Sequence, residues 1–159
     1  MKTVAVVPMK LNNRRLPQKN TKPFTNGKPL CWYILSTLLK IDRIDEVYVY
    51  CSNPEIQEFI PAGAKYLPRS TSLDQDTTKM NEVLQCFAAD VPADVYVMTH
   101  TTAPFVRPES ILKGLEAVLS GEYDSAFAAK KLTHGCVAFG EQVAELLAHL
   151  VFPPYAKNI

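Results

Sequence analysis

The sequence lacks both of the glycine-rich motifs that commonly hold nucleotide phosphates. Neither GxxxxGK[ST] nor GxGxxG occurs in its 159 residues, so a P-loop and a dinucleotide-binding fingerprint are both excluded. Its four cysteines, Cys31, Cys51, Cys86 and Cys136, form no CxxC pair, and no histidine stands at ligand spacing from them. Zinc sites and disulfides are therefore disfavoured, and ordinary reduced thiols are expected.

Long hydrophobic runs are also missing. No apolar run approaches the roughly 20 residues that a membrane-spanning helix needs. The first residues, MKTVAVVPMK, lack the apolar stretch and the small-residue cleavage site of a signal peptide. These absences predict a cytoplasmic protein without a membrane partner. A chain of 159 residues with 47% hydrophobic residues has the size of a single domain, residues 1–159, with one core.

Acidic residues are absent from the chain before Asp42. That stretch holds eight lysines and arginines, whereas the remainder holds nine basic and sixteen acidic residues. The formal net charge of +1 therefore hides a strong segregation of charge. This pattern favours a site for an anionic small molecule over a basic surface that coats nucleic acid. No nucleic-acid partner is expected, because the basic cluster is confined to one loop and aromatic residues are few.

Short β-branched runs alternate with helical patterns along the chain. The runs predict strands at Thr3–Pro8, Glu46–Cys51, Ala64–Leu67, Val95–Thr99 and Ser125–Ala129. Apolar residues at helical spacing predict helices at Leu30–Lys40, Pro54–Phe59, Thr77–Ala89 with Asp76 as N-cap, and Pro108–Ser120. Such alternation implies parallel pairing through right-handed crossovers. The expected fold is a three-layer α/β/α sandwich with a mainly parallel, Rossmann-like sheet.

The loop after the first strand is the strongest candidate for a binding site. Ligands of such sheets bind beyond the carboxyl ends of the strands, so the loops after the first four strands should share one rim. The first of these loops carries Lys10, Arg14, Arg15 and Lys19 and is far longer than the usual two to six residues. Its charge predicts contacts with phosphate oxygens. The alternative is a mobile, solvated basic loop.

The segment PMKLNNRRLPQKNTKPF, followed by GKPL at Gly27–Leu30, resembles the N-terminal motif of the acylneuraminate cytidylyltransferases, or CMP-sialic acid synthetases. The similarity continues through EVYVYCS, Arg69 and VYVMTHTTAPF to about Leu132. It implies a fold of the nucleotide-diphospho-sugar transferase type and a CTP-dependent nucleotidyltransferase. Such an enzyme transfers CMP from CTP to an acidic nine-carbon sugar of the sialic, legionaminic or pseudaminic acid type and releases pyrophosphate. Mg²⁺ is the cofactor that the resemblance implies.

The resemblance also assigns roles to single residues. It implies that Lys10 and Lys19 are catalytic, because they would neutralise charge on the triphosphate. Leu11 departs from the family, whose loop begins with an arginine and two small residues. The residues that the resemblance places at the nucleotide are Lys10, Asn12, Asn13, Arg14, Lys19, Asn20, Arg69, Asp76 and Thr78.

Arg69 and the segment Asp76-Thr77-Thr78 stand where the family reads the cytosine base. Recognition of cytosine needs donors for O2 and N3 and an acceptor for the 4-amino group. Arg69 offers the donors, and nearby main-chain carbonyls offer acceptors. Without the resemblance, a surface arginine and a helix N-cap are the simpler interpretation.

The turn after Val95–Thr99 is expected to contact the sugar. The resemblance assigns sugar binding to His100, which replaces a glutamine of the family, and to Thr101 and Thr102. General-base action of His100 on the sugar hydroxyl is a further hypothesis. The alternative is a hydrogen-bonded structural histidine at the end of a strand.

The resemblance ends after Lys131, and residues 133–159 are expected to be a divergent tail outside the family match. Relatives take their metal-binding carboxylates from a later segment, so no metal ligand is assigned. Within the tail, Glu141–Leu150 has the spacing of an amphipathic helix. We expect the tail to reflect a truncated or frame-shifted coding sequence.

Two alternatives remain open for the function of the chain. One is a catalytically impaired nucleotide-binding or interaction protein. A second is an enzyme that activates a deoxyoctulosonic acid, although the Lys19-Asn20 pair and the loop length favour a nonulosonic acid. A homodimer is a further expectation.

Overall fold

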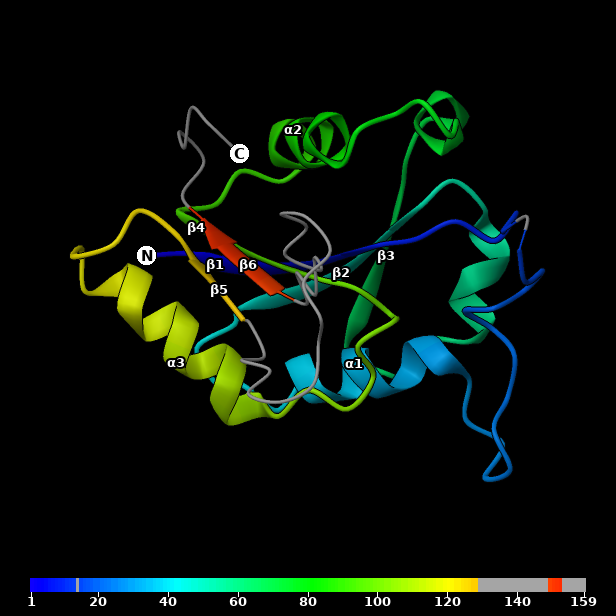
Figure 1. The fold of residues 1–159 in the computed structure, drawn as a ribbon, viewed down its shortest axis with the longest axis horizontal. Coiled ribbons are helices and arrows are strands. Elements are labelled where there is room, and N and C mark those ends of the chain that lie inside the picture. Colours follow the sequence, from blue (N-terminus) through cyan, green and yellow to red (C-terminus); the bar gives the residue numbers. More distant parts are fainter. Residues whose placement is uncertain (14, 129–148, 153–159) are drawn as a thin grey trace, which may run out of the picture.

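Four parallel strands form the centre of the molecule, as the computed structural model shows (Figure 1). The structure describes residues 1–13 and 15–128, and the backbone of residues 149–152. The strands are β1 (Thr3–Pro8), β2 (Glu46–Cys51), β3 (Ala64–Pro68), β4 (Val95–Thr99), β5 (Ala126–Phe127) and β6 (His149–Phe152). Their order in the sheet is β3-β2-β1-β4-β6-β5, and β6 runs antiparallel to both of its neighbours.

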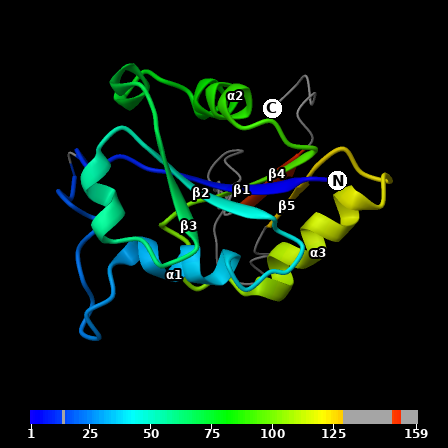
Figure 2. The ribbon, with the colours of Figure 1, turned by 180° about the vertical axis from the view of Figure 1, so that it is seen from behind.

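Among the described residues, three helices cover the two faces of this sheet. They are α1 (Leu30–Leu38), α2 (Met80–Asp90) and α3 (Pro108–Leu119), and two short 3₁₀ turns are η1 (Pro54–Glu58) and η2 (Thr71–Asp74). Both ribbon views place α2 on one face and α1 with α3 on the other (Figures 1 and 2). The predicted three-layer α/β/α sandwich with a mainly parallel sheet is therefore confirmed. Within the described ranges, no helix has the length and apolarity needed to cross a membrane.

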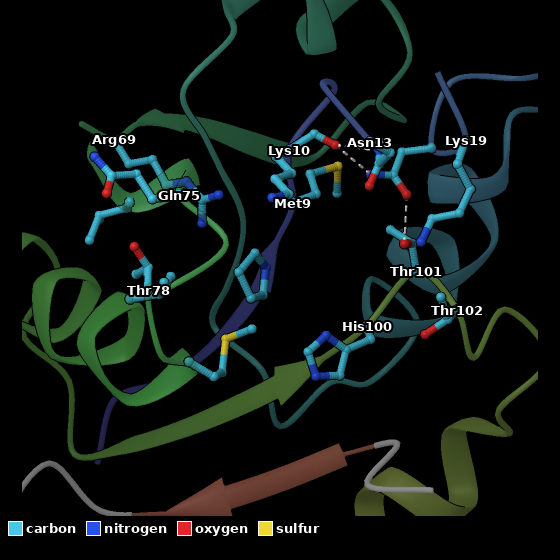
Figure 3. A pocket seen from close by; sticks show the side chains of 15 residues that line it. Met9, Lys10, Asn13, Lys19, Arg69, Gln75, Thr78, His100, Thr101 and Thr102 are labelled. Atoms are coloured by element: carbon cyan, nitrogen blue, oxygen red, sulfur yellow. Dashed lines mark hydrogen bonds between the residues drawn. The ribbon is translucent and has the colours of Figure 1, made fainter. Parts of the chain in front are cut away.

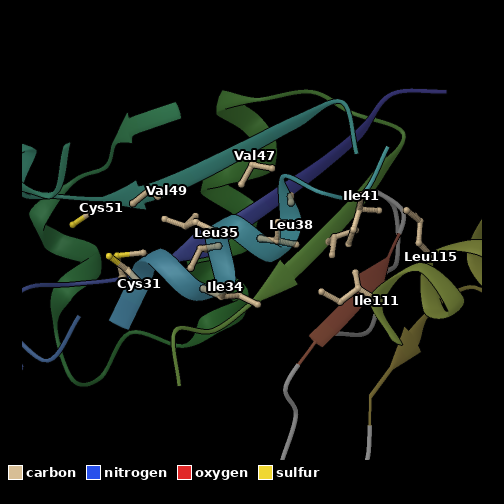
Figure 4. Close-up of a cluster of buried hydrophobic side chains, with 14 of the residues drawn as sticks. Cys31, Ile34, Leu35, Leu38, Ile41, Val47, Val49, Cys51, Ile111 and Leu115 are labelled. Atoms are coloured by element: carbon tan, nitrogen blue, oxygen red, sulfur yellow. The ribbon is translucent and has the colours of Figure 1, made fainter. Parts of the chain in front are cut away.

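The side chains of β1 contribute to the hydrophobic clusters on both faces of the sheet. Successive side chains of a strand point to opposite faces, and every residue of β1 is buried. Val4 and Val6 join a cluster with residues of α2, whereas Ala5 and Val7 join a larger cluster with residues of α1 and α3. Figure 4 shows this larger cluster between the sheet and the two helices. Burial on both faces explains why the central strands read as continuous apolar runs.

Most of the predicted strands and helices are confirmed. The bounds of β1, β2 and β4 agree with the prediction, β3 extends one residue further to Pro68, and β5 is shorter. The expected helix at Pro54–Phe59 is only a 3₁₀ turn, η1.

The structure contradicts the start of one predicted helix and the last two residues of another. The helix expected from Thr77 begins at Met80, and its N-cap is Lys79 rather than Asp76. The Glu82 carboxylate accepts a hydrogen bond from the Lys79 backbone N–H at 3.3 Å, and this contact fixes the later start. The helix expected at Glu141–Leu150 lies outside the described residues except for His149 and Leu150, which belong to β6. Pairing with β4 decides the conformation there, because a free strand edge would leave its backbone groups unpaired.

The parallel arrangement brings the loops that follow β1 to β4 to the same edge of the sheet. Backbone hydrogen bonds join the loops after β1 and β3 to the end of β2. Met9 N–H donates to the carbonyl of Tyr50 at 3.1 Å, and Arg69 N–H donates to the carbonyl of Cys51 at 3.3 Å. The rim predicted from the sequence therefore exists, and it carries the cavity described next.

Candidate functional site

A cavity of about 220 Å³ opens at this rim (Figure 3). Its walls come from the loop after β1, the segment between β3 and α2, the first turn of α2 and the turn after β4. A second cavity of about 430 Å³ adjoins it and shares Lys10, Asn13 and Lys19 with it. Single small-molecule pockets usually measure about 300 to 1,000 Å³, so the two cavities together have room for one nucleotide-sized ligand.

The structure brings together most of the residues predicted for the site. Those that line the first cavity are Lys10, Asn13, Lys19, Asn20, Arg69, Thr78, His100, Thr101 and Thr102. Asp76 lines the second cavity, together with Arg15. Asn12 is exposed and lines neither cavity, and Arg14 lies outside the described residues.

Two asparagines fix the loop after β1. The side-chain amides of Asn13 and Asn20 both donate to the carbonyl of Lys10, at 2.9 and 3.0 Å. The hydroxyl of Thr101 donates to Oδ1 of Asn20 at 2.7 Å, and both of these residues are buried. Buried polar groups need such partners, and this pair ties the loop to the end of β4. The backbone of Lys10 is held in place because its carbonyl accepts hydrogen bonds from both of these side-chain amides.

Lys10 reaches across the rim to the segment before α2. Its ammonium group donates to the carbonyl of Asp74 at 2.9 Å and to the carboxylate of Asp76 at 3.1 Å. The side chain of Asp76 is 53% exposed, and exposed ion pairs of this kind contribute only about 0 to 1 kcal/mol. A ligand with several negative charges can therefore replace Asp76 as the partner of Lys10.

Arg69 is the buried cation of the site. Its side chain is only 5% exposed, and Nη2 donates to Oδ1 of Asp74 at 2.8 Å. The guanidinium group also lies over the ring of Tyr50, 5.8 Å from the ring centre. Nε is buried and has no hydrogen-bond partner among the described residues. Because a buried charge is stable only when it is paired, Asp74 determines where this guanidinium group lies.

His100 lies at the end of β4, and its side chain faces the cavity (Figure 3). Burial lowers the pKa of its imidazole, and the nearby Lys19 cation lowers it further. The neutral ring is therefore favoured near pH 7, with one nitrogen as a donor and the other as an acceptor. Such a ring can exchange hydrogen bonds with sugar hydroxyls.

Sequence reasoning missed several residues of the site. Asp74 was not predicted, and neither was Ser52, whose hydroxyl donates to the second carboxylate oxygen of Asp74. Gln75 and Met80 line the first cavity. Ser52 directly follows the strand Glu46–Cys51, so its place on the rim was a usable signal. Nothing in the sequence distinguished Asp74 from the other polar residues around it.

The described residues contain no group of three or more histidine, cysteine, aspartate or glutamate side chains that could hold a metal ion. Asp76 is the carboxylate that lines the second cavity. Magnesium often needs only one or two protein carboxylates when substrate phosphates and waters complete its octahedral shell. The Asp76 carboxylate therefore fits as the protein ligand of a magnesium ion that a triphosphate brings with it.

The fold and the cationic cavity define the class of the protein: an α/β protein of the nucleotide-diphospho-sugar transferase type. A family model described as cytidylyltransferase matches residues 4–149, and the chain belongs to this family of nucleotidyltransferases. The resemblance stated from the sequence is thereby confirmed at the level of the family. The matched range includes part of the segment from residue 133 onward.

Three relatives show the range of this similarity. The chain is 28% identical to the CMP-N,N'-diacetyllegionaminic acid synthase of Legionella pneumophila, over 73% of this chain and 53% of the relative. It is 26% identical to the pseudaminic acid cytidylyltransferase of Campylobacter jejuni, over 84% and 60%. It is 30% identical to a 3-deoxy-manno-octulosonate cytidylyltransferase of Chlorobium phaeobacteroides, over 73% and 45%. The chain thus spans about half the length of these relatives.

Solved structures support the fold. A CMP:2-keto-3-deoxy-manno-octonic acid synthetase complexed with CTP superposes with a TM-score of 0.69 at 23% identity, over 80% of this chain and 52% of that protein. A cytidylyltransferase from Leptospira borgpetersenii gives the same TM-score at 13% identity, over 97% and 61%. At these identities the comparison shows the fold alone.

Proposed function

We propose that this chain binds CTP in the rim cavity and transfers CMP to an acidic nonulosonic sugar, with release of pyrophosphate. The observation that carries the proposal is the convergence of Lys10, Lys19 and Arg69 on one cavity at the carboxyl ends of parallel strands. The family membership and the similarity to synthases of activated legionaminic and pseudaminic acid support it.

Lys10 and Lys19 form the phosphate end of the proposed site. Both lysines line the two adjoining cavities. The anomeric hydroxyl of the sugar attacks the α-phosphorus of CTP and loses its proton to the neutral His100 ring or to water, and the bond between the α-phosphorus and the oxygen that bridges to the β-phosphorus breaks. Charge then accumulates on the departing pyrophosphate, and the two ammonium groups stabilise that charge. In this proposal both lysines act as catalytic residues.

Arg69 forms the base end of the proposed site. It lies on the wall formed by the segment between β3 and α2, together with Gln75 and Thr78 (Figure 3). Its N–H groups suit the acceptors O2 and N3 of cytosine, whereas N3 of uracil is a donor. This difference supports CTP as the nucleotide.

The turn after β4 forms the sugar end of the proposed site. His100, Thr101 and Thr102 line the cavity beside Lys19. The Thr101 hydroxyl is already committed to Asn20, so we assign the direct sugar contacts to His100 and Thr102. Lys19 adds a positive charge near the carboxylate of a sugar acid.

Magnesium is proposed to enter with the triphosphate, and Asp76 would hold it. When bound, the ion supplies charge neutralisation on the phosphates. Asp76 would first have to leave Lys10, and their exposed ion pair is weak enough to permit this exchange.

A second candidate substrate is the eight-carbon 3-deoxy-octulosonic acid. It is favoured by the 30% identity to a 3-deoxy-manno-octulosonate cytidylyltransferase. Both kinds of sugar acid carry a carboxylate next to the anomeric carbon, so the phosphate chemistry is the same for either.

Calorimetric titration with CTP, UTP, ATP and GTP in magnesium tests the nucleotide assignment. We expect selective binding of CTP. A pyrophosphate-release assay with N-acetylneuraminic, legionaminic, pseudaminic and 3-deoxy-octulosonic acids then tests the transfer. Release with a nine-carbon acid supports the proposal, and release with the eight-carbon acid alone selects the second candidate. Absence of CTP binding contradicts both.

A further inference from the structure

One residue outside both cavities binds the cations of the phosphate end and the base end. The carboxylate of Asp74 accepts from Arg69 Nη2 at 2.8 Å, and its backbone carbonyl accepts from Lys10 Nζ at 2.9 Å. Arg69 and Lys10 line the first cavity, whereas Asp74 lines neither cavity. Asp74 is thus placed to act on a ligand through these two side chains.

The carboxylate of Asp74 is itself fixed by a third loop. Ser52, which follows β2, donates its hydroxyl to the other carboxylate oxygen. The loops after β1, β2 and β3 therefore meet at Asp74. The turn η2 that carries this residue is closed by a hydrogen bond from Leu73 N–H to the Ser70 carbonyl at 3.1 Å.

Burial makes the ion pair with Arg69 decisive for the orientation of the guanidinium group. The two side chains are 5% and 13% exposed. Removing one partner of such a pair leaves an uncompensated buried charge. Nε of Arg69 has no hydrogen-bond partner among the described residues. The ion pair with Asp74, and not the pairing of every guanidinium N–H group, therefore determines where this side chain lies.

We propose that Asp74 is a positioning residue that aims Arg69 at the base and so sets the preference for CTP over UTP. The inference rests on the proposed function and adds to it the source of base selectivity. With the carboxylate present, the N–H groups of Arg69 hold one direction toward the acceptors of cytosine. Without it, the guanidinium group can rotate and meet the uracil carbonyls as readily.

The test compares Asp74→Ala and Asp74→Asn with the wild type by calorimetry, using CTP, UTP and inorganic tripolyphosphate. We expect Asp74→Ala to lower the ratio of CTP to UTP affinity by about tenfold, the size of one lost hydrogen bond to a charged group. Tripolyphosphate affinity should change less than about twofold, because the backbone carbonyl of residue 74 still holds Lys10. Asp74→Asn keeps an acceptor oxygen, so its ratio of CTP to UTP affinity should lie between those of the wild type and of Asp74→Ala.

A double-mutant cycle separates positioning from general damage. In an Arg69→Ala background, Asp74→Ala should not change the CTP to UTP ratio further. An equal loss of affinity for all three ligands, or a second loss in the Arg69→Ala background, overturns the inference. If the wild type binds CTP selectively and Asp74→Ala is equally selective, the inference is overturned but the proposed function is not. A wild type without CTP binding overturns the proposed function as well. Asp74→Asn provides the same comparison should Asp74→Ala fail to fold.

Discussion

Lys10 and Lys19 differ in how far their charges are already neutralised. Lys10 donates to Asp74 and Asp76, whereas the Lys19 ammonium group has no side-chain partner in the part of the chain that the structure describes. A triphosphate that meets Lys19 does not have to displace a protein carboxylate first. Lys19 is therefore the residue at which removal of a charge should affect binding most directly.

Lys19→Ala should weaken CTP binding by about 1.5 to 3 kcal/mol, the range typical of hydrogen bonds to charged groups. Isothermal titration at constant salt measures the change. The matched control is Lys22→Ala, which removes an exposed lysine of the same loop that lines neither cavity. Equal dissociation constants for wild type and Lys19→Ala would remove Lys19 from the phosphate site.

His100 should make the fold sensitive to mild acid. Its folded-state pKa is lowered from the ordinary value of 6.5, chiefly by burial and also by Lys19. Below pH 6.5 the unfolded chain binds the proton more readily, so this contribution to stability is fully present above that pH and is lost as the pH falls. Between pH 7.5 and 5.5, the wild type should lose more free energy of unfolding than His100→Gln.

Urea unfolding of the two proteins at both pH values measures this difference. The remaining histidines are the same in both chains and cancel in the comparison. An equal loss in both proteins would show that His100 titrates as it does in the unfolded chain. An NMR titration of the imidazole provides an independent readout.

The residue types of the candidate site were predictable from the sequence, but the contacts among them were not. Lys10, Lys19 and Arg69 stood out because cations follow strands whose carboxyl ends must share a rim. The role of Asp74 depends on the close approach of three loops. Such an approach is a property of the tertiary fold, and spacing along the chain does not report it.

At the scale of the elements, the aromatic contacts of α2 anchor it to the sheet. Phe87 is 1% exposed and meets the rings of Tyr48, Tyr50 and Tyr96 edge to face, at centroid distances of 5.8, 5.3 and 6.0 Å. Such arrangements add to the burial of apolar area. The helix in turn holds Met80 and Val83 at the cavity wall.

Phe87→Ala should lower the free energy of unfolding by about 3 to 5 kcal/mol, the usual cost of truncating a buried phenylalanine. Denaturant unfolding followed by circular dichroism measures it. Phe105→Ala is the control, because Phe105 is 78% exposed and its loss should change stability by less than about 0.5 kcal/mol. Similar values for the two variants would mean that α2 does not depend on this contact.

Strands were easier to predict than the ends of helices. Central strands such as β1 are buried on both faces, and the resulting apolar runs have clear limits in the sequence. The start of α2 was placed too early because Asp76 is a good N-cap residue by type. In the folded chain, Asp76 instead pairs with Lys10. The 3₁₀ turn η2 and the antiparallel strand β6 depend on their neighbours and leave little periodic signal.

At the scale of the whole molecule, charge is divided between two parts of the sequence. Eight basic residues precede the first acidic residue, Asp42, and the remainder of the chain carries more acidic than basic residues. Lys10 and Lys19 come from the basic part, and the ion pair of Lys10 with Asp76 joins it to the acidic part. Lys10 and Lys19 bring positive charge from the basic part to the rim cavity.

This segregation predicts a strong dependence of CTP affinity on salt. Between 0.1 and 1 M NaCl the Debye length falls from about 10 to 3 Å, which screens the attraction between the partly exposed lysines of the cavity and the triphosphate. Binding of cytidine should change much less, because cytidine lacks phosphates and Arg69 is buried. Calorimetry with both ligands over this range measures the two slopes. A steep fall for CTP beside a flat response for cytidine is expected, because cations at the phosphate end dominate the long-range attraction. Equal slopes would instead mean that salt acts on the fold or on the base end of the site, and the division of the cavity into a phosphate end and a base end would be wrong.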